Sequence, residues 1–470
     1  MTKLAGTPVG AGEALGVGWG TVLVAGAGVT GRSAAEALLA AGAEVVVTDS
    51  SPERLAALET LLEGVELVPG LTEPPAGTSL VVTSPGWQPS SPLLAAAAAA
   101  GIEVIGEVEL AWRMGTELAD PPVWLAVTGT NGKTTTVGML ESILHAAGAD
   151  AVACGNVGLP VVDALLAGRR VLAVELSSFQ LYWAPSVRPQ AGALLNLAED
   201  HLDWHGGMDA YAQAKARILT GDVAIGWLDD DLVGDLLEAS PARDRIGFTL
   251  DEPEDGQLGV RDGWLVDRAF ADDEALVEVA KIRPAGPPGI ADALAATALA
   301  RAYGVPSEAV REGLEAFEPA AHRAVLVTVD ATDIKYVNDS KATNPHAAVA
   351  SLRAFDNVVW IAGGLLKGAS VEEMVRTEAR RLRGAVLIGA DRQVIADALA
   401  KHAPDVPVRS LDLADADDPM LDVVRAAQEL AQAGDTVLLA PAAASMDMFN
   451  DYAHRGQAFT DAVKRLTGGR

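Results

Sequence analysis

Short runs of apolar residues alternate along the chain with glycine-rich turns and with stretches of helical periodicity. The first such unit consists of an apolar run at residues 21–25, a helical stretch at 33–41 and a second apolar run at 45–48. A strand, a helix and a second strand in this order are typical of a βαβ unit with parallel strands. The hydrophobic pattern therefore predicts an α/β fold.

The same pattern restarts twice, which predicts three successive α/β segments. New segments open with apolar runs at 123–127 and 325–329, and we expect boundaries near residues 112 and 319. The predicted segments are 1–112, 113–319 and 320–470. Further strands are predicted at 80–83, 104–105, 171–174, 193–197, 358–362, 385–388 and 436–439, a helix at 291–303, and edge hairpins or loops in the acidic stretch 251–283. A length of 470 residues agrees with several domains.

The composition of the chain limits the classes of ligand and partner that we expect. The chain has 64 Asp and Glu against 35 Lys and Arg, a net charge of −29, so a nucleic-acid-binding role is disfavoured. A phosphorylated ligand must then be held by local groups such as glycine loops, helix N-termini, a few cations and metal ions. The single cysteine, Cys154, fits a reducing compartment. With no signal pattern and no apolar run of membrane-spanning length, we expect a cytoplasmic protein without a membrane partner.

A first glycine loop lies between the strand at 21–25 and the helix that follows it. Gly26, Gly28 and Gly31 fit G-x-G-x-x-G, and Asp49 ends the next strand. Glycines at these positions allow a diphosphate to approach the helix N-terminus, and an acid at the end of the second strand can bind a ribose. By itself the motif is typical of nicotinamide- or flavin-dependent dehydrogenases, and a tight turn without a ligand is the other interpretation.

A second glycine loop, at residues 128–135, lies between the strand at 123–127 and a helix beginning near Lys133. Gly132, Lys133 and Thr134 supply what a nucleoside triphosphate needs: backbone N–H groups around the phosphates, a cation, and a hydroxyl for Mg²⁺. Val127 stands where the common P-loop pattern has a glycine. A glycine-rich turn with a solvated lysine is the alternative. Two phosphate loops imply two nucleotides, which disfavours a dehydrogenase.

The loop around Lys133 resembles the ATP loop of the Mur ligases and folylpolyglutamate synthetases, and the resemblance extends over nearly the whole chain. The matching stretches, in the family's order, are 84–86, 106–110, 155–158, 175–181, 196–203, 322–323, 338–344, 363–367 and 445–449. The resemblance implies a three-domain α/β fold. A Rossmann-like UDP-binding domain is followed by a central P-loop-type ATP-binding domain and a C-terminal Rossmann-like domain that binds D-glutamate.

The activity implied by the resemblance is ATP-dependent ligation of D-glutamate to UDP-N-acetylmuramoyl-L-alanine through an acyl phosphate, in peptidoglycan precursor synthesis, by a monomer. The loop 339–344 and the absence of an Asp-Asn-Pro-Arg motif favour D-glutamate over L-alanine, a diamino acid or a dipeptide. The first glycine loop and Asp49 argue against a folylpolyglutamate synthetase. A nicotinamide-dependent oxidoreductase would leave Lys133 and Lys341 unexplained, and a non-catalytic nucleotide-binding scaffold is the remaining alternative.

The resemblance also assigns site residues. Those implied for ATP are Gly129, Thr130, Asn131, Gly132, Lys133, Thr134, Thr135, Asn156 and Arg323. Two Mg²⁺ ions are implied on Thr134, Glu175, His201 and a carbamylated Lys215, and the catalytic set is Lys133, Glu175, His201 and Lys215. Substrate-binding residues are Gly28, Val29, Thr30, Asp49 and Ser84 in the first segment and Asp339, Lys341, Thr343, Lys367, Ser445, Met446 and Tyr452 in the third.

Several of these residues have ordinary structural interpretations. Glu175 can cap the helix that follows it, and His201 can be a core histidine. Without the family, Lys215 would be a solvated lysine on an amphipathic helix. Lys341 and Lys367 can be loop or surface lysines.

The chain also departs from the family at three places. Tyr452 stands where the family usually has Phe, and Pro288-Gly289 stands where a His-Asn pair helps to hold adenine. No arginine follows Asp49 directly, so Arg54 is the candidate to replace it.

Overall fold

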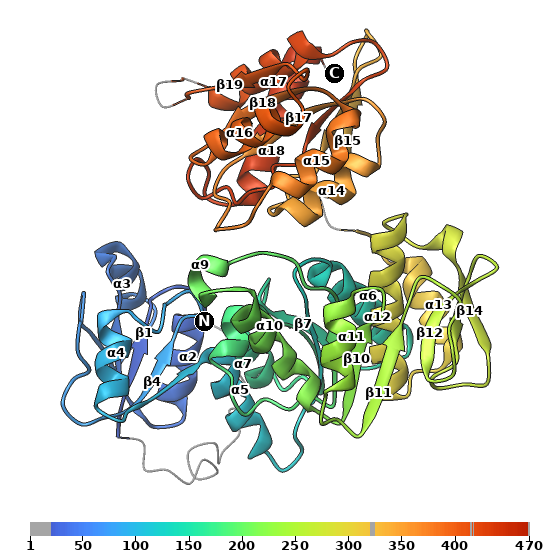
Figure 1. Ribbon diagram of the computed structural model, residues 1–470. Coiled ribbons are helices and arrows are strands. Elements are labelled where there is room, and N and C mark those ends of the chain that lie inside the picture. The colour runs from blue at the N-terminus through green and yellow to red at the C-terminus, as the bar shows by residue number, and fades with distance from the viewer. Residues whose placement is uncertain (1–19, 320–324, 414–415, 417, 469–470) are drawn as a thin grey trace. The chain divides into compact units, whose positions relative to one another are not determined.

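The computed structural model describes residues 20–319, 325–413, 416 and 418–468. The chain divides into two compact units: the first takes in the chain up to Leu197 together with Ala212–Glu318, and the second takes in Ala198–Tyr211 and the chain from Pro319 onward. Three sheets of five, nine and six strands, covered by helices, form the architecture (Figure 1). The predicted α/β fold class is confirmed.

The first sheet is parallel and has the order β3-β2-β1-β4-β5. Its strands are β3 (Val65–Leu67), β2 (Glu44–Thr48), β1 (Thr21–Ala25), β4 (Thr78–Thr83) and β5 (Glu103–Gly106), and its helices are α2 (Val29–Ala40), α3 (Pro52–Glu59), α4 (Pro92–Ala99) and α5 (Glu107–Thr116). The strand order reverses between β1 and β4. In open α/β sheets this reversal opens a crevice at the carboxyl ends of the strands, where ligands bind.

The central sheet has the order β14-β13-β12-β11-β10-β9-β6-β8-β7. Its strands are β6 (Val123–Thr128), β7 (Ala151–Gly155), β8 (Val171–Glu175), β9 (Ala191–Leu194), β10 (Val223–Trp227), β11 (Asp244–Phe248), β12 (Gln257–Arg261), β13 (Trp264–Asp267) and β14 (Glu274–Glu278). The strands from β7 to β12 are parallel, whereas β12, β13 and β14 are antiparallel, so the hairpins predicted in 251–283 are confirmed. The helical elements along this part of the chain are α6 (Lys133–Ala146), α7 (Val161–Leu166), α8 (Ser178–Tyr182), α9 (Leu202–His205), α10 (Met208–Ala216), η1 (Arg217–Thr220), α11 (Asp231–Glu238), η2 (Val279–Lys281), α12 (Pro287–Tyr303) and α13 (Ser307–Ala316).

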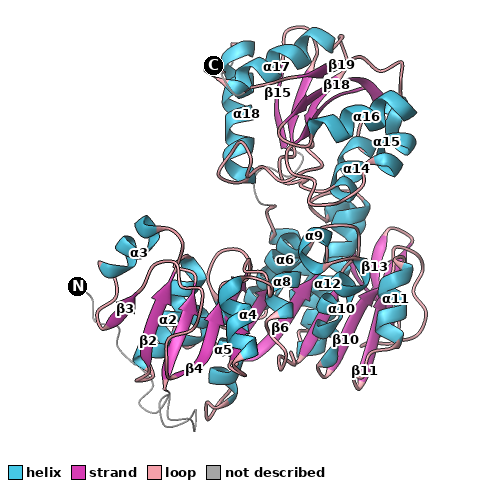
Figure 2. Ribbon diagram, turned by 60° about the vertical axis from the view of Figure 1, so that its left-hand side comes forward, coloured by secondary structure: helices cyan, strands magenta, loops and turns pink. Residues whose placement is uncertain are grey.

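The third sheet has the order β15-β16-β20-β17-β18-β19, and only the β15–β16 pair is antiparallel. Its strands are β15 (Val325–Val329), β16 (Lys335–Asn338), β17 (Val358–Gly363), β18 (Leu382–Ile388), β19 (Val408–Ser410) and β20 (Thr436–Leu439), with α14 (Pro345–Arg353), α15 (Glu372–Glu378), η3 (Ala379–Arg381), α16 (Arg392–His402), α17 (Pro419–Leu430) and α18 (Tyr452–Thr467). β17 contributes Trp360 to one core and Ile361 to the other. Helices cover both faces of this sheet (Figure 2).

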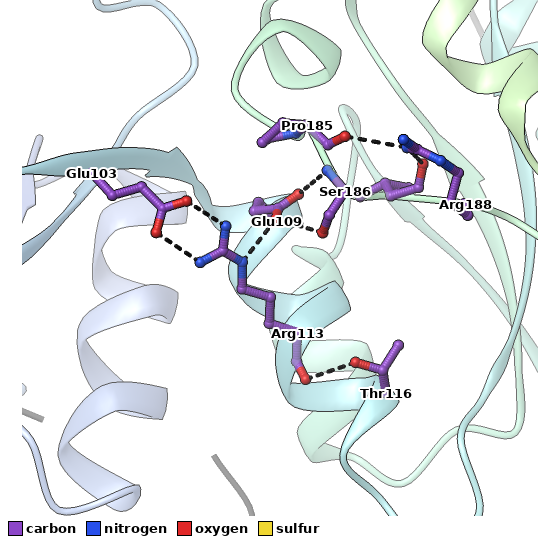
Figure 3. Close-up of polar contacts among 8 residues, drawn as sticks. Glu103, Glu109, Arg113, Thr116, Pro185, Ser186 and Arg188 are labelled. Atoms are coloured by element: carbon purple, nitrogen blue, oxygen red, sulfur yellow. Dashed lines mark hydrogen bonds and ion pairs between the residues drawn. The ribbon is translucent and has the colours of Figure 1, made fainter. Parts of the chain in front are cut away.

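The first and central sheets share one hydrophobic core, to which both β1 and β8 contribute. Helix α5 forms the join, and residue 112, the predicted boundary, lies inside it. The buried Glu109 on α5 accepts hydrogen bonds from Ser186 N at 3.0 Å and Ser186 Oγ at 2.6 Å (Figure 3). Arg113 then connects Glu109 to Glu103, with N–O distances of 2.8 and 2.6 Å (Figure 3). The two glycine loops are therefore carried by one compact unit.

Several predicted element boundaries differ from the observed ones: β4 and β18 begin two and three residues earlier than predicted, at Thr78 and Leu382, and α2, α12 and β9 differ near a glycine loop or a proline. Helix α2 begins at Val29 rather than residue 33, so Gly31 lies inside it. A glycine is needed there because a Cβ would collide with the carbonyl of Gly26. Helix α12 begins at Pro287 rather than residue 291, since proline is favoured in a first turn. Strand β9 ends at Leu194, where the chain bends toward the second glycine loop. In the part of the chain that the structure describes, no helix is long and apolar enough to cross a membrane.

Candidate active site

The second glycine loop connects β6 to α6 and is built as an anion-binding turn. Gly132 has a φ of +87°, and a Cβ at this position would collide with a carboxylate oxygen of Asp292. Lys133 is the first residue of α6, a helix of 14 residues, so the loop leads directly to a helix N-terminus, whose first N–H groups have no partner within the helix. This arrangement fits the phosphates of a nucleotide.

Asn196, which follows β9, holds the loop from the neighbouring strand. Asn131 N donates to Asn196 Oδ1 at 2.9 Å, and Asn196 Nδ2 donates to Asn131 O at 3.2 Å. The backbone of Asn196 also accepts from Thr130 N at 2.9 Å. Asn196 was not among the predicted site residues, although it is the first residue of a stretch, 196–203, that resembles the family.

Two lysines donate to the carbonyl of Gly129. Lys133 Nζ lies 2.9 Å from Gly129 O and from Thr130 O. Lys215 Nζ lies 2.7 Å from Gly129 O and 3.3 Å from Thr128 Oγ1. Lys215 is 2% exposed, so its interpretation as a solvated lysine is wrong. The side chains of two lysines therefore meet at this turn, directly before the N-terminus of α6.

Glu175 ends β8, beside β6, and is buried. Its Oε1 accepts from Asn156 Nδ2 at 2.9 Å, and its carbonyl accepts from Asn156 N at 2.8 Å. The next helix, α8, is capped by Ser177 and Gln180 instead, so the interpretation of Glu175 as a helix cap is wrong. A buried carboxylate at the strand end nearest the phosphate loop fits a metal ligand.

Asp292 was missed as a site residue. It lies in α12, is buried, and accepts from Thr136 Oγ1 of α6 at 3.3 Å. Pro288 and Gly289, the departures from the family's His-Asn pair, lie in the first turn of the same helix. The signal in the sequence was a lone carboxylate on an alanine-rich helix, because burial of a carboxylate is costly unless hydrogen bonds or a paired charge compensate it.

The first glycine loop carries an acid rather than cations. Asp49 accepts hydrogen bonds from Ala27 N at 2.8 Å and Ser51 N at 2.9 Å. Arg54 Nη1 lies 3.7 Å from Asp49 Oδ2 and is well exposed, so Arg54 is the arginine that faces Asp49. Val29 is also exposed, and Ser84, after β4, lies against Gly26. The structure thus places Asp49 and Ser84 at the carboxyl ends of β2 and β4, the two neighbours of β1.

In the second unit, several of the predicted substrate-binding residues lie in the loops that follow β16 and β20. Lys341 Nζ donates to the hydroxyl of Tyr452 at 3.1 Å and lies 4.3 Å from the centre of its ring. The hydroxyl that distinguishes Tyr452 from the family's Phe is therefore a partner of Lys341. Ser445 is buried, whereas Met446 is 76% exposed. Thr343 N donates to the carbonyl of Lys341 at 2.8 Å, which shapes the turn that carries both.

Lys367 does not behave as a surface lysine. It lies in the turn after β17, and its Nζ is 2.5 Å from Asp200 Oδ1 and 3.4 Å from His201 Nε2. His201 is partly exposed, so its interpretation as a core histidine is wrong. The amide of Ser370, in the same turn, donates to Glu199 at 3.1 Å. Lys367 and His201 thus share one carboxylate in the second unit.

The proposed magnesium ligands fall in both units: Thr134, Glu175 and Lys215 belong to the first, and His201 to the second. Within the described ranges, no group of three or more His, Cys, Asp and Glu residues is arranged to hold a metal ion. The metal assignment stays a prediction. Arg323 lies outside the described residues.

Comparisons with known proteins agree over most of the chain. Three family models match: a Mur ligase MurD-like N-terminal domain at 20–106, a Mur ligase middle domain at 127–262 and a Mur ligase glutamate ligase domain at 322–443. The chain is 53% identical over 478 residues to a UDP-N-acetylmuramoylalanine–D-glutamate ligase of Rhodococcus jostii, covering 95% of each chain, and 54% identical over 468 residues to the protein of the same name from Nocardia farcinica, covering 95% of this chain and 97% of the other. A solved UDP-N-acetylmuramate–alanine ligase of Thermotoga maritima shares the fold, with a TM-score of 0.58 at 18% identity over 96% of this chain and 100% of the other.

Proposed function

Because the chain belongs to the Mur ligase family, we propose that it uses ATP to join D-glutamate to UDP-N-acetylmuramoyl-L-alanine. The observation that supports the proposal most directly is the convergence of Lys133 and Lys215 on Gly129 in the turn before α6. That turn offers backbone amides and the ammonium group of Lys133 to a triphosphate. The names of the relatives supply the substrates, which the fold alone does not distinguish.

The chemistry follows from the weakness of a carboxylate as an electrophile. The terminal phosphoryl group of ATP passes to the carboxylate of the L-alanyl residue, which gives an acyl phosphate and ADP. The amine of D-glutamate then attacks the acyl carbon, an amide bond forms, inorganic phosphate leaves and the amine loses a proton. Lys133 and the loop amides stabilise the charge on the phosphates during the first step.

Magnesium binding is part of the proposal, and the residues present fit it. Glu175 offers a buried carboxylate, and Thr134 offers a hydroxyl in the first turn of α6. Mg²⁺ would supply positive charge next to the phosphates. We place Lys215 in this set as a carbamate, formed when its neutral amine adds CO₂ and releases a proton. Burial of Lys215 supports this, because desolvation favours a neutral amine.

The three segments have separate tasks in this proposal. Segment 1–112 binds the UDP end through Gly28, Val29, Thr30, Asp49 and Ser84. Segment 113–319 binds ATP through the turn around Lys133, with Asn156 near the terminal phosphate. Segment 320–470 binds D-glutamate through Asp339, Lys341, Thr343, Lys367, Ser445, Met446 and Tyr452, and it brings Arg323 to the nucleotide. We place the reaction in the cytoplasm and expect the enzyme to act as a monomer.

The test is phosphate release from ATP in the presence of Mg²⁺ and UDP-N-acetylmuramoyl-L-alanine. D-Glutamate, L-glutamate, L-alanine and diaminopimelate are compared as second substrates, with a control lacking the UDP substrate. We expect release with D-glutamate only. Turnover with another of these amino acids would move the enzyme to a different step of the same family, and no release in any mixture would overturn the proposal.

A further inference from the structure

Arg455 is a fully buried arginine that the proposed reaction does not use. It lies in α18 and is 0% exposed. Its Nε donates to Ser340 Oγ at 3.0 Å, and its Nη2 donates to Ser340 O at 2.9 Å. Its Nη1 donates to Ala443 O at 3.0 Å and approaches Gly363 O at 3.5 Å. One guanidinium therefore holds three separate pieces of backbone.

These three pieces lie at the carboxyl ends of adjacent strands. Ser340 follows β16, Ala443 follows β20, and Gly363 ends β17, and the three strands are neighbours in the order β16-β20-β17. The same loops carry Lys341, Ser445 and Lys367. A ligand of an open α/β sheet binds at this edge, so Arg455 lies beneath the surface proposed for the amino acid.

The backbone that Arg455 holds is strained. Ala442 has a φ of +59°, a left-handed conformation that is unfavourable for a residue with a Cβ. Its N–H donates to Ala342 O at 2.9 Å, which ties the loop after β20 to the loop after β16. Arg455 binds the next carbonyl, that of Ala443. Strained turns persist when their surroundings over-determine them, and Arg455 supplies part of that constraint.

The charge of Arg455 has no contacting counter-ion among the described residues, since all its partners are a hydroxyl or carbonyls. Burial lowers the pKa of Arg455 to about 10, and the field of Asp447 opposes this change. The carboxylate of Asp447 itself accepts from Ala390 N at 2.8 Å. At neutral pH Arg455 is therefore a buried cation that forms no ion pair with a described residue. A buried cation of this kind favours an anion nearby.

We propose that Arg455 is a positioning residue for the amino-acid substrate: it fixes the three loops at the carboxyl ends of β16, β17 and β20, and its charge favours an acidic amino acid there. The inference rests on the proposed function, because it takes the occupant of this edge to be D-glutamate. Arg455 does not touch the substrate in this account. It acts through Ser340, Gly363 and Ala443.

The experiment compares Arg455→Met, Arg455→Lys and the control Arg465→Met in steady-state kinetics of the full-length enzyme. Arg465 lies on the same helix, is exposed and pairs with Asp418, so its replacement should leave all KM values unchanged. Arg455→Met should raise the KM for D-glutamate about 30-fold while the KM values for ATP and the UDP substrate stay within about twofold. Arg455→Lys, which keeps the charge with fewer donors, should raise the KM for D-glutamate about fivefold.

A second readout separates charge from loop positioning. The ratio of kcat/KM for D-glutamate over D-glutamine should fall about tenfold in Arg455→Met and stay near the wild-type value in Arg455→Lys. If Arg455→Met does not fold, Ser340→Ala tests the same contact, with an expected threefold rise in the KM for D-glutamate alone.

Equal rises in all three KM values, or an unchanged KM for D-glutamate in the folded variants, would overturn the inference while leaving the proposed function intact. A wild-type enzyme that makes no product with D-glutamate would overturn the proposed function and the inference with it.

Discussion

The two glycine loops of the first unit share a strand–turn–helix geometry but differ in the charge around them. At the loop before α2, the amide of Ala27 is bound by the carboxylate of Asp49. At the loop before α6, the carbonyl of Gly129 is bound by Lys133 and Lys215. An acid next to a glycine turn suits neutral hydroxyl or amide groups of a nucleotide, whereas the cation of Lys133 suits a triphosphate whose charge grows during transfer. The backbone motif alone therefore does not specify the ligand; the side chains around it do.

The largest effect expected from this comparison is that of Lys133→Ala. Removing one preorganised cation from a phosphoryl-transfer site should lower kcat about 10³-fold. Binding of the UDP substrate, measured by calorimetry without ATP, should stay within about twofold, because that substrate uses the other loop. Full turnover in the variant would show that the turn before α6 is not the ATP site.

Lys215→Ala should lower kcat about 10²- to 10³-fold, and small molecules can show which charge is lost. If Lys215 acts as a carbamate, formate or acetate should restore part of the activity. If Lys215 acts as the ammonium group that binds Gly129 O, ethylamine should restore it instead. Rescue by the amine alone would contradict the carbamate, and Lys133→Ala, rescued by neither anion, is the control.

Helix α5, which joins the two sheets that carry the glycine loops, gives a prediction about how the stability of the protein depends on pH. Burial raises the pKa of Glu107 to about 7, and the amide of Val162, which donates to Glu107 Oε1 at 2.7 Å, opposes this rise only in part. Since the folded pKa lies above the usual value of 4.5, the folded state binds more protons between these values. Stability should therefore fall by roughly 3 kcal/mol as the pH rises through this window.

Glu107→Gln should remove most of that fall, so the variant should gain thermal stability over the wild type at pH 8 but not at pH 5. The matched control is Glu103→Gln, also at this join. Its hydrogen bond to Arg113 lowers the pKa of Glu103, so the sign is opposite: the wild-type stabilisation is present above pH 4.5 and is lost on acidification. A wild-type melting temperature that is flat from pH 5 to pH 8 would contradict the assignment for Glu107.

The sequence predicted the parts of the fold in which local pattern and tertiary structure agree. Strands β1, β15 and β20 were predicted with their observed bounds, and helix α6 was predicted to start at Lys133. Short or edge strands such as β3 and β19 were missed, since three residues carry too little periodicity to be recognised. The acidic stretch 251–283 was correctly predicted as edge hairpins because glycines and charges break it into short pieces.

The site was predictable only where residues are adjacent in sequence. The turn around Lys133 follows from its motif, but the burial of Lys215 depends on its contact with Gly129, 86 residues away. The clamp by Asn196 and the buried Arg455 are likewise long-range contacts that no local pattern records. Whether Lys215 is solvated or buried could be decided only from the three-dimensional structure.

The smallest effect concerns the acid of the first loop. Asp49→Asn keeps an oxygen that can accept from Ala27 N or Ser51 N, but the bond is no longer charge-assisted, and the pairing with Arg54 is lost. A charge-assisted hydrogen bond differs from a neutral one by about 1 kcal/mol, so the Kd for the UDP substrate should rise about fivefold to tenfold. Calorimetric titration measures this Kd. The matched variant is Arg54→Gln, which removes the exposed partner of Asp49. We expect its Kd to change twofold at most, because exposed ion pairs contribute little.

The KM for ATP should be unchanged in both variants, since Asp49 and Lys133 serve different loops. A rise in the KM for ATP that matches the rise for the UDP substrate would mean that the acid maintains the shared core rather than one ligand site, and the contrast between the two loops would then not hold.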